Sequence, residues 1–233
     1  MISRPREEDL VPFNHTMKYS FEQLVTYCND ESHRDHVKRT GRPFIISLDG
    51  NIGAGKTTLL SQLQTRIDPK RVVIVPEPVD VWTQLKDLGD GMSILEKFYR
   101  WPMLYSFAFQ VTVFHTVIRS MDDAIEANPE CEVLVCERSV ATSRDVFMKM
   151  LLADRKITVF ENLLYQQMFS PRIEQQYFPN IIVFLDVPPR ICFERMIQRQ
   201  RTDETTVTVD YLERLDTVYR DWLGSNIIKV DNL

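Results

Sequence analysis

The sequence lacks the features by which a chain of this length would bind nucleic acid or enter a membrane. Its formal net charge is −5, so no surface for nucleic acid is indicated. No apolar run approaches the length of a membrane span, and there are no repeats or low-complexity tracts. Hydrophobic (44%) and charged (26%) contents are ordinary for a globular protein of 233 residues. We therefore expect one α/β domain with an extension, and no nucleic acid or membrane partner.

Cysteine is scarce, and its spacing matches no metal site. The four cysteines are Cys28, Cys131, Cys136 and Cys192. Cys131 and Cys136 flank a predicted strand at a separation that suits no zinc motif. We interpret all four as reduced, mostly buried thiols of a cytosolic-type compartment. The N-terminus lacks the apolar segment of a secretory signal, and the acidic residues at 7–9 argue against a mitochondrial transit peptide, so a cytoplasmic location is expected.

Residues 1–42 lack the alternation of strands and helices that begins after them. They are polar and of mixed charge, and a short helix is expected at 21–28. A basic run at 33–42 contains His33 and His36, but no cysteine or carboxylate stands at a spacing suited to a shared metal, so the run is interpreted as a solvated face. We expect an N-terminal extension at 1–42, partly disordered or a short helix, ahead of the main domain at 43–233.

From residue 43 on, apolar runs alternate with stretches of helical spacing. This pattern predicts a parallel sheet with helices on both faces. Five strands are expected, because the runs are rich in Val and Ile and continuous, as in strands buried on both faces: 44–49, 71–76, 132–136, 180–186 and 227–230. Helices are expected at 56–67, 80–87, 92–126, 142–152, 156–174, 188–199 and 207–223, with a break or kink at Pro102.

One eight-residue segment is the most informative about function. Residues 50–57 fit the phosphate-binding pattern G-x-x-x-x-G-K-[ST], between a predicted strand and a predicted helix. The glycines let the backbone turn its N–H groups inward, and the helix adds the positive end of its dipole. Lys56 would reach the β- and γ-phosphates, and the Thr57 hydroxyl would ligate Mg²⁺. The candidate ATP site consists of Gly50, Asn51, Ile52, Gly53, Ala54, Gly55, Lys56, Thr57 and Thr58.

Charged residues follow the predicted strands at the edge where open parallel sheets bind ligands. Glu77 follows the second strand, Glu137 and Arg138 follow the third, and three arginines end the helix after the fourth. Each alone could be a solvated turn residue, a surface ion pair or a charged helix face. Together, beside a phosphate loop, they indicate phosphoryl transfer. Glu77 suits the general base on an acceptor hydroxyl, and Glu137 suits the metal, directly or through water.

With these motifs in order, residues 44–231 resemble the deoxynucleoside kinases, a family that includes deoxycytidine kinase, deoxyguanosine kinase, mitochondrial thymidine kinase and the insect broad-range enzyme. The matching motifs are the phosphate loop, Glu77-Pro78-Val79 with Trp82, Tyr99 with Pro102, Phe109-Gln110, Glu137-Arg138-Ser139-Val140 and the arginine-rich run from Arg195 to Glu204. The resemblance implies a P-loop kinase fold with a lid segment, and a homodimer packed through helices. It also implies ATP- and Mg²⁺-dependent transfer of the γ-phosphate to the 5′-hydroxyl of a deoxynucleoside, in nucleotide salvage, with feedback inhibition by a deoxynucleoside triphosphate.

The resemblance further implies roles for the matching polar residues. Glu77 would be the general base on the 5′-hydroxyl, Arg138 would hold that hydroxyl or the incoming phosphate, and Glu137 would lie near the metal. Tyr99 and Glu204 would bind the 3′-hydroxyl. The lid would close over the donor phosphates through Arg199 and Arg201, assisted by Arg195.

The base pocket is expected to favour thymidine. Gln110 would make two hydrogen bonds to the base, between walls formed by Trp82, Phe109 and Phe147, although each aromatic alone could be an ordinary core residue. Deoxycytidine and deoxyguanosine kinases carry an arginine and an aspartate where this chain has Val117 and Ser143. Val113 and Val117 would instead leave room for a 5-methyl group. Because the Gln110 amide can flip to suit cytosine, deoxycytidine is a second expected substrate.

Two other functions remain as alternatives. A nucleoside monophosphate kinase of the thymidylate kinase type has a related fold, but it would need basic groups for the phosphate of its acceptor, which Glu77 would repel. A nucleotide-binding module without catalysis is the second alternative, although none of the expected catalytic side chains is missing. A deoxynucleoside kinase that acts on thymidine and other pyrimidines is therefore the main prediction.

Overall fold

The centre of the fold is a parallel sheet with the strand order β1-β6-β5-β2-β4-β3. The computed structural model describes residues 17–199, 207–224 and 228–230. Every pairing between neighbouring strands is parallel. Four longer strands form the middle of the sheet: β5 (Ile181–Leu185), β2 (Phe44–Gly50), β4 (Val133–Glu137) and β3 (Val72–Val75). Two strands of three residues, β6 (Ile228–Val230) and β1 (Met17–Tyr19), extend the edge beside β5.

The number of strands differs from the expected number. All five expected strands are present, but among the described residues the sheet has six, so the prediction of a five-stranded sheet is wrong. The additional strand, β1, lies in the polar segment 1–42 and pairs with β6, from Met17↔Ile228 to Tyr19↔Val230. A three-residue edge strand is held by backbone hydrogen bonds to one neighbour, and so short a segment carries no detectable hydrophobic alternation.

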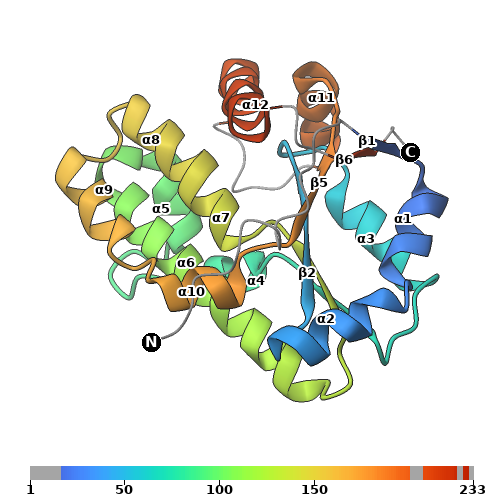
Figure 1. Ribbon diagram of the computed structural model, residues 1–233. Coiled ribbons are helices and arrows are strands. Elements are labelled where there is room, and N and C mark those ends of the chain that lie inside the picture. The colour runs from blue at the N-terminus through green and yellow to red at the C-terminus, as the bar shows by residue number, and fades with distance from the viewer. Residues whose placement is uncertain (1–16, 200–206, 225–227, 231–233) are drawn as a thin grey trace.

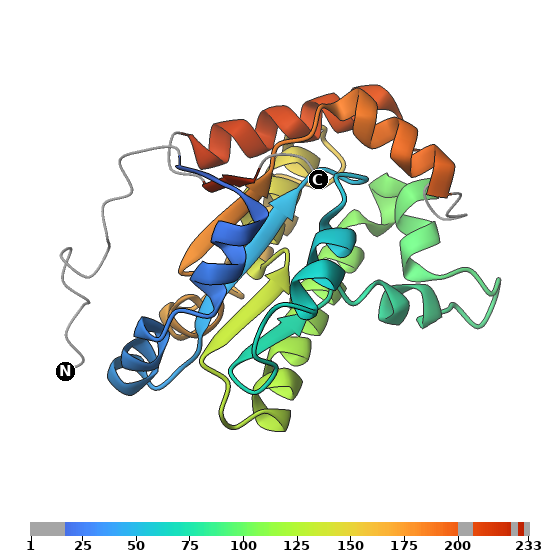
Figure 2. The same ribbon diagram turned by 90° about the vertical axis from the view of Figure 1, so that its right-hand side faces the viewer.

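Helices cover both faces of the sheet, as expected for parallel strands (Figures 1 and 2). Helices α1 (Phe21–Cys28) and α3 (Lys56–Gln64) cover one face. The other face is covered by α4 (Val79–Gln84), α5 (Ile94–Arg100), α6 (Pro102–Ala127), α7 (Val140–Thr142), α8 (Lys149–Ala153), α9 (Val159–Gln166) and α10 (Pro171–Tyr177). Helices α11 (Pro189–Arg199) and α12 (Val209–Leu223) lie across the end of the sheet to which β2 points.

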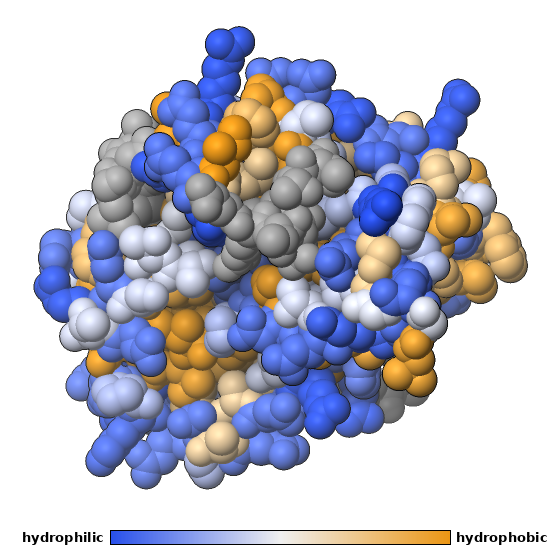
Figure 3. Space-filling view, turned by 180° about the vertical axis from the view of Figure 1, so that it is seen from behind, coloured by the Kyte–Doolittle hydropathy of each residue, from blue (hydrophilic) through white to orange (hydrophobic). Residues whose placement is uncertain are grey.

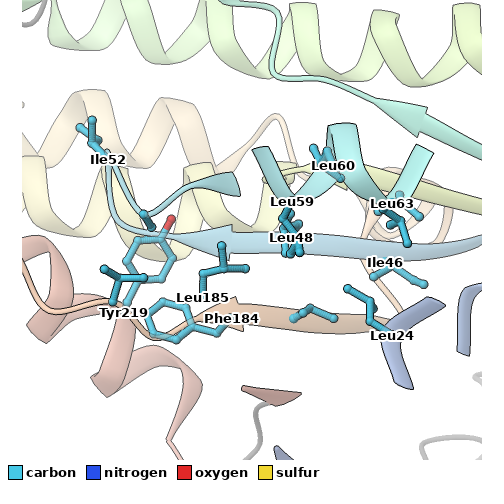
Figure 4. Packing of buried hydrophobic residues seen from close by; sticks show 14 of the residues in the cluster. Leu24, Ile46, Leu48, Ile52, Leu59, Leu60, Leu63, Phe184, Leu185 and Tyr219 are labelled. Carbon is cyan, nitrogen blue, oxygen red and sulfur yellow. The ribbon is translucent and has the colours of Figure 1, made fainter. Parts of the chain in front are cut away.

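The sheet divides the hydrophobic core into two clusters. Ile46 and Leu48 of β2 face the cluster that contains α1 and α3, whereas Ile45 faces the cluster beneath α6. Figure 4 shows the first cluster, with Leu59 and Leu63 of α3 packed above β2. The four cysteines are buried and free, as expected. Because β2 is packed on both faces, its carboxyl end is held firmly where the phosphate loop begins.

The N-terminal extension contains more structure than its sequence suggests. The helix expected at 21–28 is confirmed, and it buries Leu24 in the main core. A second helix, α2 (Ser32–Thr40), was not expected. His33 is only 4% exposed, lies 2.8 Å from the carbonyl oxygen of Tyr27 through Nε2 and packs against the Phe44 ring. The interpretation of 33–42 as a solvated face is therefore wrong at His33, because its burial depends on residues from α1 and β2.

Three long helical stretches are divided in the structure. The expected break near Pro102 is confirmed, because α5 ends at Arg100 and Pro102 begins α6. The stretch 156–174 is two helices, α9 and α10, since the Ser170 hydroxyl caps a new start at Pro171. The stretch 142–152 contains a π-helix, Ser143–Met148, between α7 and α8. Within the described ranges, no helix combines the length and apolarity needed to cross a bilayer.

Candidate active site

The phosphate loop runs from β2 into α3, in the predicted context of strand, loop and helix. Gly53 and Gly55 have φ values of 80° and 97°, in the left-handed region that favours glycine. A Cβ atom on Gly53 would lie 2.2 Å from the carbonyl oxygen of Cys192 in α11. Glycine at position 53 is therefore required both by the backbone conformation and by the close approach of α11.

Asn51 connects the phosphate loop to α12. Its side-chain Nδ2 donates to the carbonyl oxygen of Leu212 over 2.8 Å, and its Oδ1 accepts from the backbone N–H of Ile52 over 2.9 Å. Asn51 is 1% exposed, so both bonds are protected from water. The position of the loop is thus tied to the first turns of α12 as well as to β2 and α3.

Lys56 lies inside the loop rather than in solvent. Its Nζ donates to the carbonyl oxygens of Gly50 and Asn51, at 3.2 and 2.9 Å, and the residue is 5% exposed. Burial, followed by the charge of Arg138, lowers the pKa of Lys56 to about 8. A phosphate group beside the ammonium would favour the charged form and raise that pKa again.

We expect ATP binding to weaken as the pH rises through 8. Above that pH the free protein carries a neutral Lys56, which must take up a proton when phosphates arrive. Titration calorimetry at about pH 8.5 in buffers of different ionisation enthalpy should detect this proton uptake. In the Lys56→Arg variant the guanidinium stays charged, so the uptake should vanish; an equal uptake in both proteins would show that another group is responsible.

Thr57 and Glu137 form an oxygen-donor pair at the head of α3. The Thr57 hydroxyl lies 3.0 Å from Glu137 Oε2 and 3.3 Å from Oε1. Glu137 ends β4 and pairs in register with Leu48 of β2, which explains why it reaches the loop. Mg²⁺ binds through one or two protein oxygens, with phosphates and waters completing its octahedron. The donor set at Thr57 and Glu137 therefore fits this ion.

Glu77 and Arg138 form a bidentate ion pair at the ends of β3 and β4. Arg138 Nη1 lies 2.6 and 2.7 Å from the two carboxylate oxygens of Glu77. The Arg138 side chain is 10% exposed and the Glu77 side chain is 18% exposed. Burial alone would lower the pKa of Arg138, but the charges of Glu77 and Glu137 and the contact with Tyr219 together outweigh burial and raise that pKa, so the guanidinium stays charged. The pair places one carboxylate in a fixed orientation beside the phosphate loop.

The backbone at Arg138 departs from the ordinary range. Its φ is 63°, an uncommon value for a residue other than glycine, and it costs of order 1 kcal/mol or more. The backbone N–H donates to the carbonyl oxygen of Leu48 over 3.0 Å, and Nη2 lies 3.4 Å from the carbonyl oxygen of Gly50. These bonds hold Arg138 against the start of the phosphate loop in spite of the strained conformation.

A cavity of about 270 Å³ lies at the carboxyl ends of these strands and collects most of the predicted site residues. One part is lined by the phosphate loop and the charged pair, and the other by apolar side chains of α4, α5 and α6. The predicted residues that line it are Ile52, Gly53, Lys56, Thr57, Glu77, Trp82, Tyr99, Phe109, Gln110, Val113, Val117, Glu137, Arg138, Ser143, Phe147 and Arg199. The single cavity therefore connects the phosphate loop with an apolar pocket.

The apolar part of the cavity contains one buried amide. Gln110 is 2% exposed, and among the described residues its Oε1 has no hydrogen-bond partner. Phe109 stacks on Phe98 with centroids 4.6 Å apart and meets the Trp82 ring at 5.3 Å, edge to face. A hydrogen bond from Trp82 Nε1 to Thr116 Oγ1, at 2.9 Å, fixes the indole. An amide with an unpaired oxygen between flat rings is suited to the polar edge of a planar ligand.

Some predicted residues lie outside the cavity. Arg195 donates from Nη1 to the carbonyl oxygen of Ala54 over 3.2 Å, so it supports the loop from α11. Of the described candidates, Gly50, Asn51, Ala54 and Gly55 belong to the loop and Thr58 belongs to α3, and none of the five lines the cavity. The remaining two candidates, Arg201 and Glu204, lie outside the described residues. Their proposed contacts with the donor phosphates and the 3′-hydroxyl stay predictions.

Several lining residues were not among the expected site residues, although two of them, Val79 and Ser139, belong to the matched motifs. They are Pro76, Val79, Asp80, Leu95, Phe98, Ser139 and Tyr211. Leu95 and Phe98 are three residues apart and share one face of α5 with Tyr99 beside it, so helical spacing from Tyr99 could have indicated them. Tyr211 lies in the first turn of α12, and its burial raises the pKa of its phenol. No local pattern marks Tyr211, because only tertiary packing brings α12 to the cavity.

Comparison with known proteins agrees with this geometry. A model of the deoxynucleoside kinase family matches residues 46–231. A probable deoxycytidine kinase of fowlpox virus is 32% identical over 185 residues, which cover 78% of this chain and 72% of the viral protein. Deoxycytidine kinase 2 of Gallus gallus is 30% identical over 203 residues, 80% and 76% of the two chains. The thymidine kinase of ictalurid herpesvirus 1 is 32% identical over 189 residues, 78% and 75% of the two chains. Because the family model covers residues 46–231 and these relatives are 30–32% identical over 78–80% of the chain, the chain belongs to the deoxynucleoside kinase family.

Proposed function

We propose that this kinase transfers the γ-phosphate of ATP to the 5′-hydroxyl of thymidine and other pyrimidine deoxynucleosides. The observation that carries the proposal is the position of the Glu77 carboxylate in one cavity with Lys56 and Gln110. Arg138 holds that carboxylate from the side of the phosphate loop. A nucleoside with its base at Gln110 would therefore direct its sugar hydroxyl toward Glu77 and the donor phosphates.

The proposed chemistry requires one proton transfer and one displacement. Glu77 accepts the proton of the 5′-hydroxyl as that oxygen bonds to the γ-phosphorus, and the bond from this phosphorus to the β-phosphate oxygen breaks, which releases ADP. Lys56 stabilises the charge on the transferring group, and Arg138 orients the Glu77 carboxylate. Thr57 and Glu137 would hold Mg²⁺, which supplies further charge neutralisation when bound.

The pyrimidine preference is supported by the walls around Gln110. The unpaired Oε1 could accept from N3–H of thymine while the amide NH₂ donates to O4, and a flipped amide would suit cytosine. Val113 and Val117 line the same part of the cavity and provide an apolar surface for a 5-methyl group. A purine would need more space than a pyrimidine beside the Phe98–Phe109 stack and the Trp82 ring.

A panel of four deoxynucleosides, with ATP and Mg²⁺, tests this function. We expect kcat/KM for thymidine and deoxycytidine to exceed that for either purine by about tenfold or more, which corresponds to one or two lost contacts in the pocket. A clear purine preference would refute the proposed base specificity. Absence of phosphorylation of all four would refute the proposed reaction.

The same panel, extended to thymidine monophosphate, separates the two alternative functions. A monophosphate kinase would have to accept the acceptor phosphate close to Glu77, whose carboxylate is fixed by Arg138 and would repel it. Faster turnover of the monophosphate than of thymidine would favour that alternative. ATP binding without turnover of any acceptor would favour a non-catalytic nucleotide-binding module.

We also propose that two chains associate through the outer face of α9. Val159, Phe160, Leu163 and Leu164 are 43–77% exposed there, and Figure 3 shows hydrophobic surface at the edge of the molecule where α9 lies. An apolar helix face of this kind is typical of a subunit interface.

In sedimentation velocity we expect a dimer, which Phe160→Glu converts to a monomer. Leu88→Glu, at a fully exposed leucine outside α9, should remain dimeric; a monomeric starting protein would contradict the proposal.

A further inference from the structure

Tyr219 of α12 places a buried hydroxyl against the guanidinium of Arg138. The oxygen lies 3.4 Å from Nε, whereas Glu77 occupies Nη1 and the carbonyl oxygen of Gly50 faces Nη2. Each nitrogen of the guanidinium therefore has an acceptor of its own. Of these three acceptors, Tyr219 is the one that comes from outside the strand ends and the phosphate loop.

The same hydroxyl contacts the carboxylate of Asp49. The distance from the Tyr219 oxygen to Asp49 Oδ1 is 3.3 Å. Asp49 is fully buried in β2, directly before the phosphate loop, and accepts further bonds from Ser47 at 2.6 Å and Thr142 at 2.8 Å. The phenol therefore lies between a buried carboxylate and a buried guanidinium, and it can donate to the first while it accepts from the second.

The tyrosine itself is held rigidly. It is 0% exposed, and its ring packs against Phe184 with centroids 5.3 Å apart. Figure 4 shows the hydroxyl directed toward the carboxyl end of β2. Burial and the nearby Asp49 carboxylate raise the pKa of Tyr219, so the hydroxyl keeps its proton at any physiological pH and always has one to donate.

We infer that Tyr219 is a positioning residue, whose hydroxyl couples Asp49 at the head of the phosphate loop to Arg138 and so fixes the orientation of Glu77 relative to the donor site. Without the hydroxyl, Nε of Arg138 loses its acceptor, and the guanidinium can rotate away from the geometry in which it holds both Glu77 oxygens. Phosphoryl transfer requires the base, the acceptor oxygen and the phosphorus to be aligned within a fraction of an ångström. The inference depends on the roles proposed above for Glu77 and Arg138.

Kinetics of Tyr219→Phe test this coupling, because the variant keeps the ring and removes only the hydroxyl. We expect kcat for thymidine to fall by about tenfold, with KM for thymidine and for ATP within twofold of the original values, since alignment rather than binding is lost. The matched control is Tyr177→Phe. That buried tyrosine also donates to a carboxylate, Asp122 at 2.9 Å, but it does not line the cavity, so its kcat should be unchanged.

A measurement on the unaltered protein keeps the test valid even if Tyr219→Phe does not fold. The Nε–H of Arg138, identified in NMR spectra by its loss in Arg138→Lys, should exchange with water far more slowly than that of Arg119, whose side chain is 71% exposed. Slow exchange in the unaltered protein and a tenfold loss of kcat in folded Tyr219→Phe support the inference. Fast exchange, or a folded Tyr219→Phe with unchanged kcat, would overturn it.

The failure of this inference can be distinguished from failure of the proposed function. If Arg138→Lys lowers kcat strongly and Tyr219→Phe does not, the site assignment stands and the role of Tyr219 is wrong. If Arg138→Lys and Tyr219→Phe both retain full activity, the proposed roles of Arg138 and Glu77 are wrong, and the inference is overturned with them.

Discussion

Replacement of Glu77 by glutamine should lower kcat by about 10³-fold, the middle of the range for loss of a general base. Glutamine keeps the size of the side chain and can still accept a hydrogen bond from Arg138, so the pocket should remain intact. What it loses is the proposed ability of Glu77 to take the proton from the 5′-hydroxyl. We therefore expect the dissociation constant of thymidine, measured by calorimetry, to stay within about threefold while steady-state turnover falls.

A matched control for Glu77→Gln is Glu174→Gln. Glu174 also binds an arginine, Arg144, at 2.6 Å, but the pair lies away from the cavity. Its kcat should equal that of the starting protein. If Glu77→Gln turned over thymidine at more than about a tenth of the original rate, Glu77 would not be the general base, because that loss is smaller than such a group contributes.

Replacement of Arg138 by methionine should reduce both stability and activity. Removal of one partner of a buried ion pair leaves the Glu77 carboxylate without its counter-charge, which costs about 3 kcal/mol or more in the free energy of unfolding. In addition, kcat/KM for thymidine should fall by about 10²- to 10³-fold, because the carboxylate is no longer oriented. Urea unfolding and steady-state kinetics on the same preparation measure the two effects.

Two further variants show whether the charge pair is the cause. In Glu77→Gln/Arg138→Met no charge is left unpaired, so stability should recover part of the loss seen in Arg138→Met alone. Arg144→Met breaks a partly buried arginine pair outside the cavity and should lower stability without changing kcat/KM. An Arg138→Met protein as active as Arg144→Met would be inconsistent with a role for Arg138 in the site.

The parts of the site that could be predicted from sequence are those that follow strands. Glu77, Glu137 and the phosphate loop each come directly after an apolar run, and parallel topology brings the carboxyl ends of adjacent strands together. Gln110 and Val117 were identified by a resemblance in motif spacing, and α6 does present both to the cavity. Short-range pattern and sheet topology were sufficient for the residues at the strand ends, whereas the α6 residues were found only through the resemblance to the family.

The features that were missed depend on contacts between distant segments. Tyr219 lies 170 positions after Asp49, and nothing around it in the sequence marks it as different from a core tyrosine. Helix α2 has a polar sequence, and His33 is buried only because Tyr27 and Phe44 pack around it. The π-helix that carries Ser143 and Phe147 follows the same apolar spacing as an α-helix over so few residues.

The pairing of β1 with β6 has a consequence for folding. Met17 lies beside Ile228, although 211 positions separate them in the chain. Closing so long a loop is slow, and during synthesis the N-terminal strand cannot find its neighbour until the last residues of β6 have left the ribosome. The sheet edge at β1 should therefore form last, after β2 to β5 and their helices have assembled, and it should be the first part of the sheet to open in hydrogen exchange.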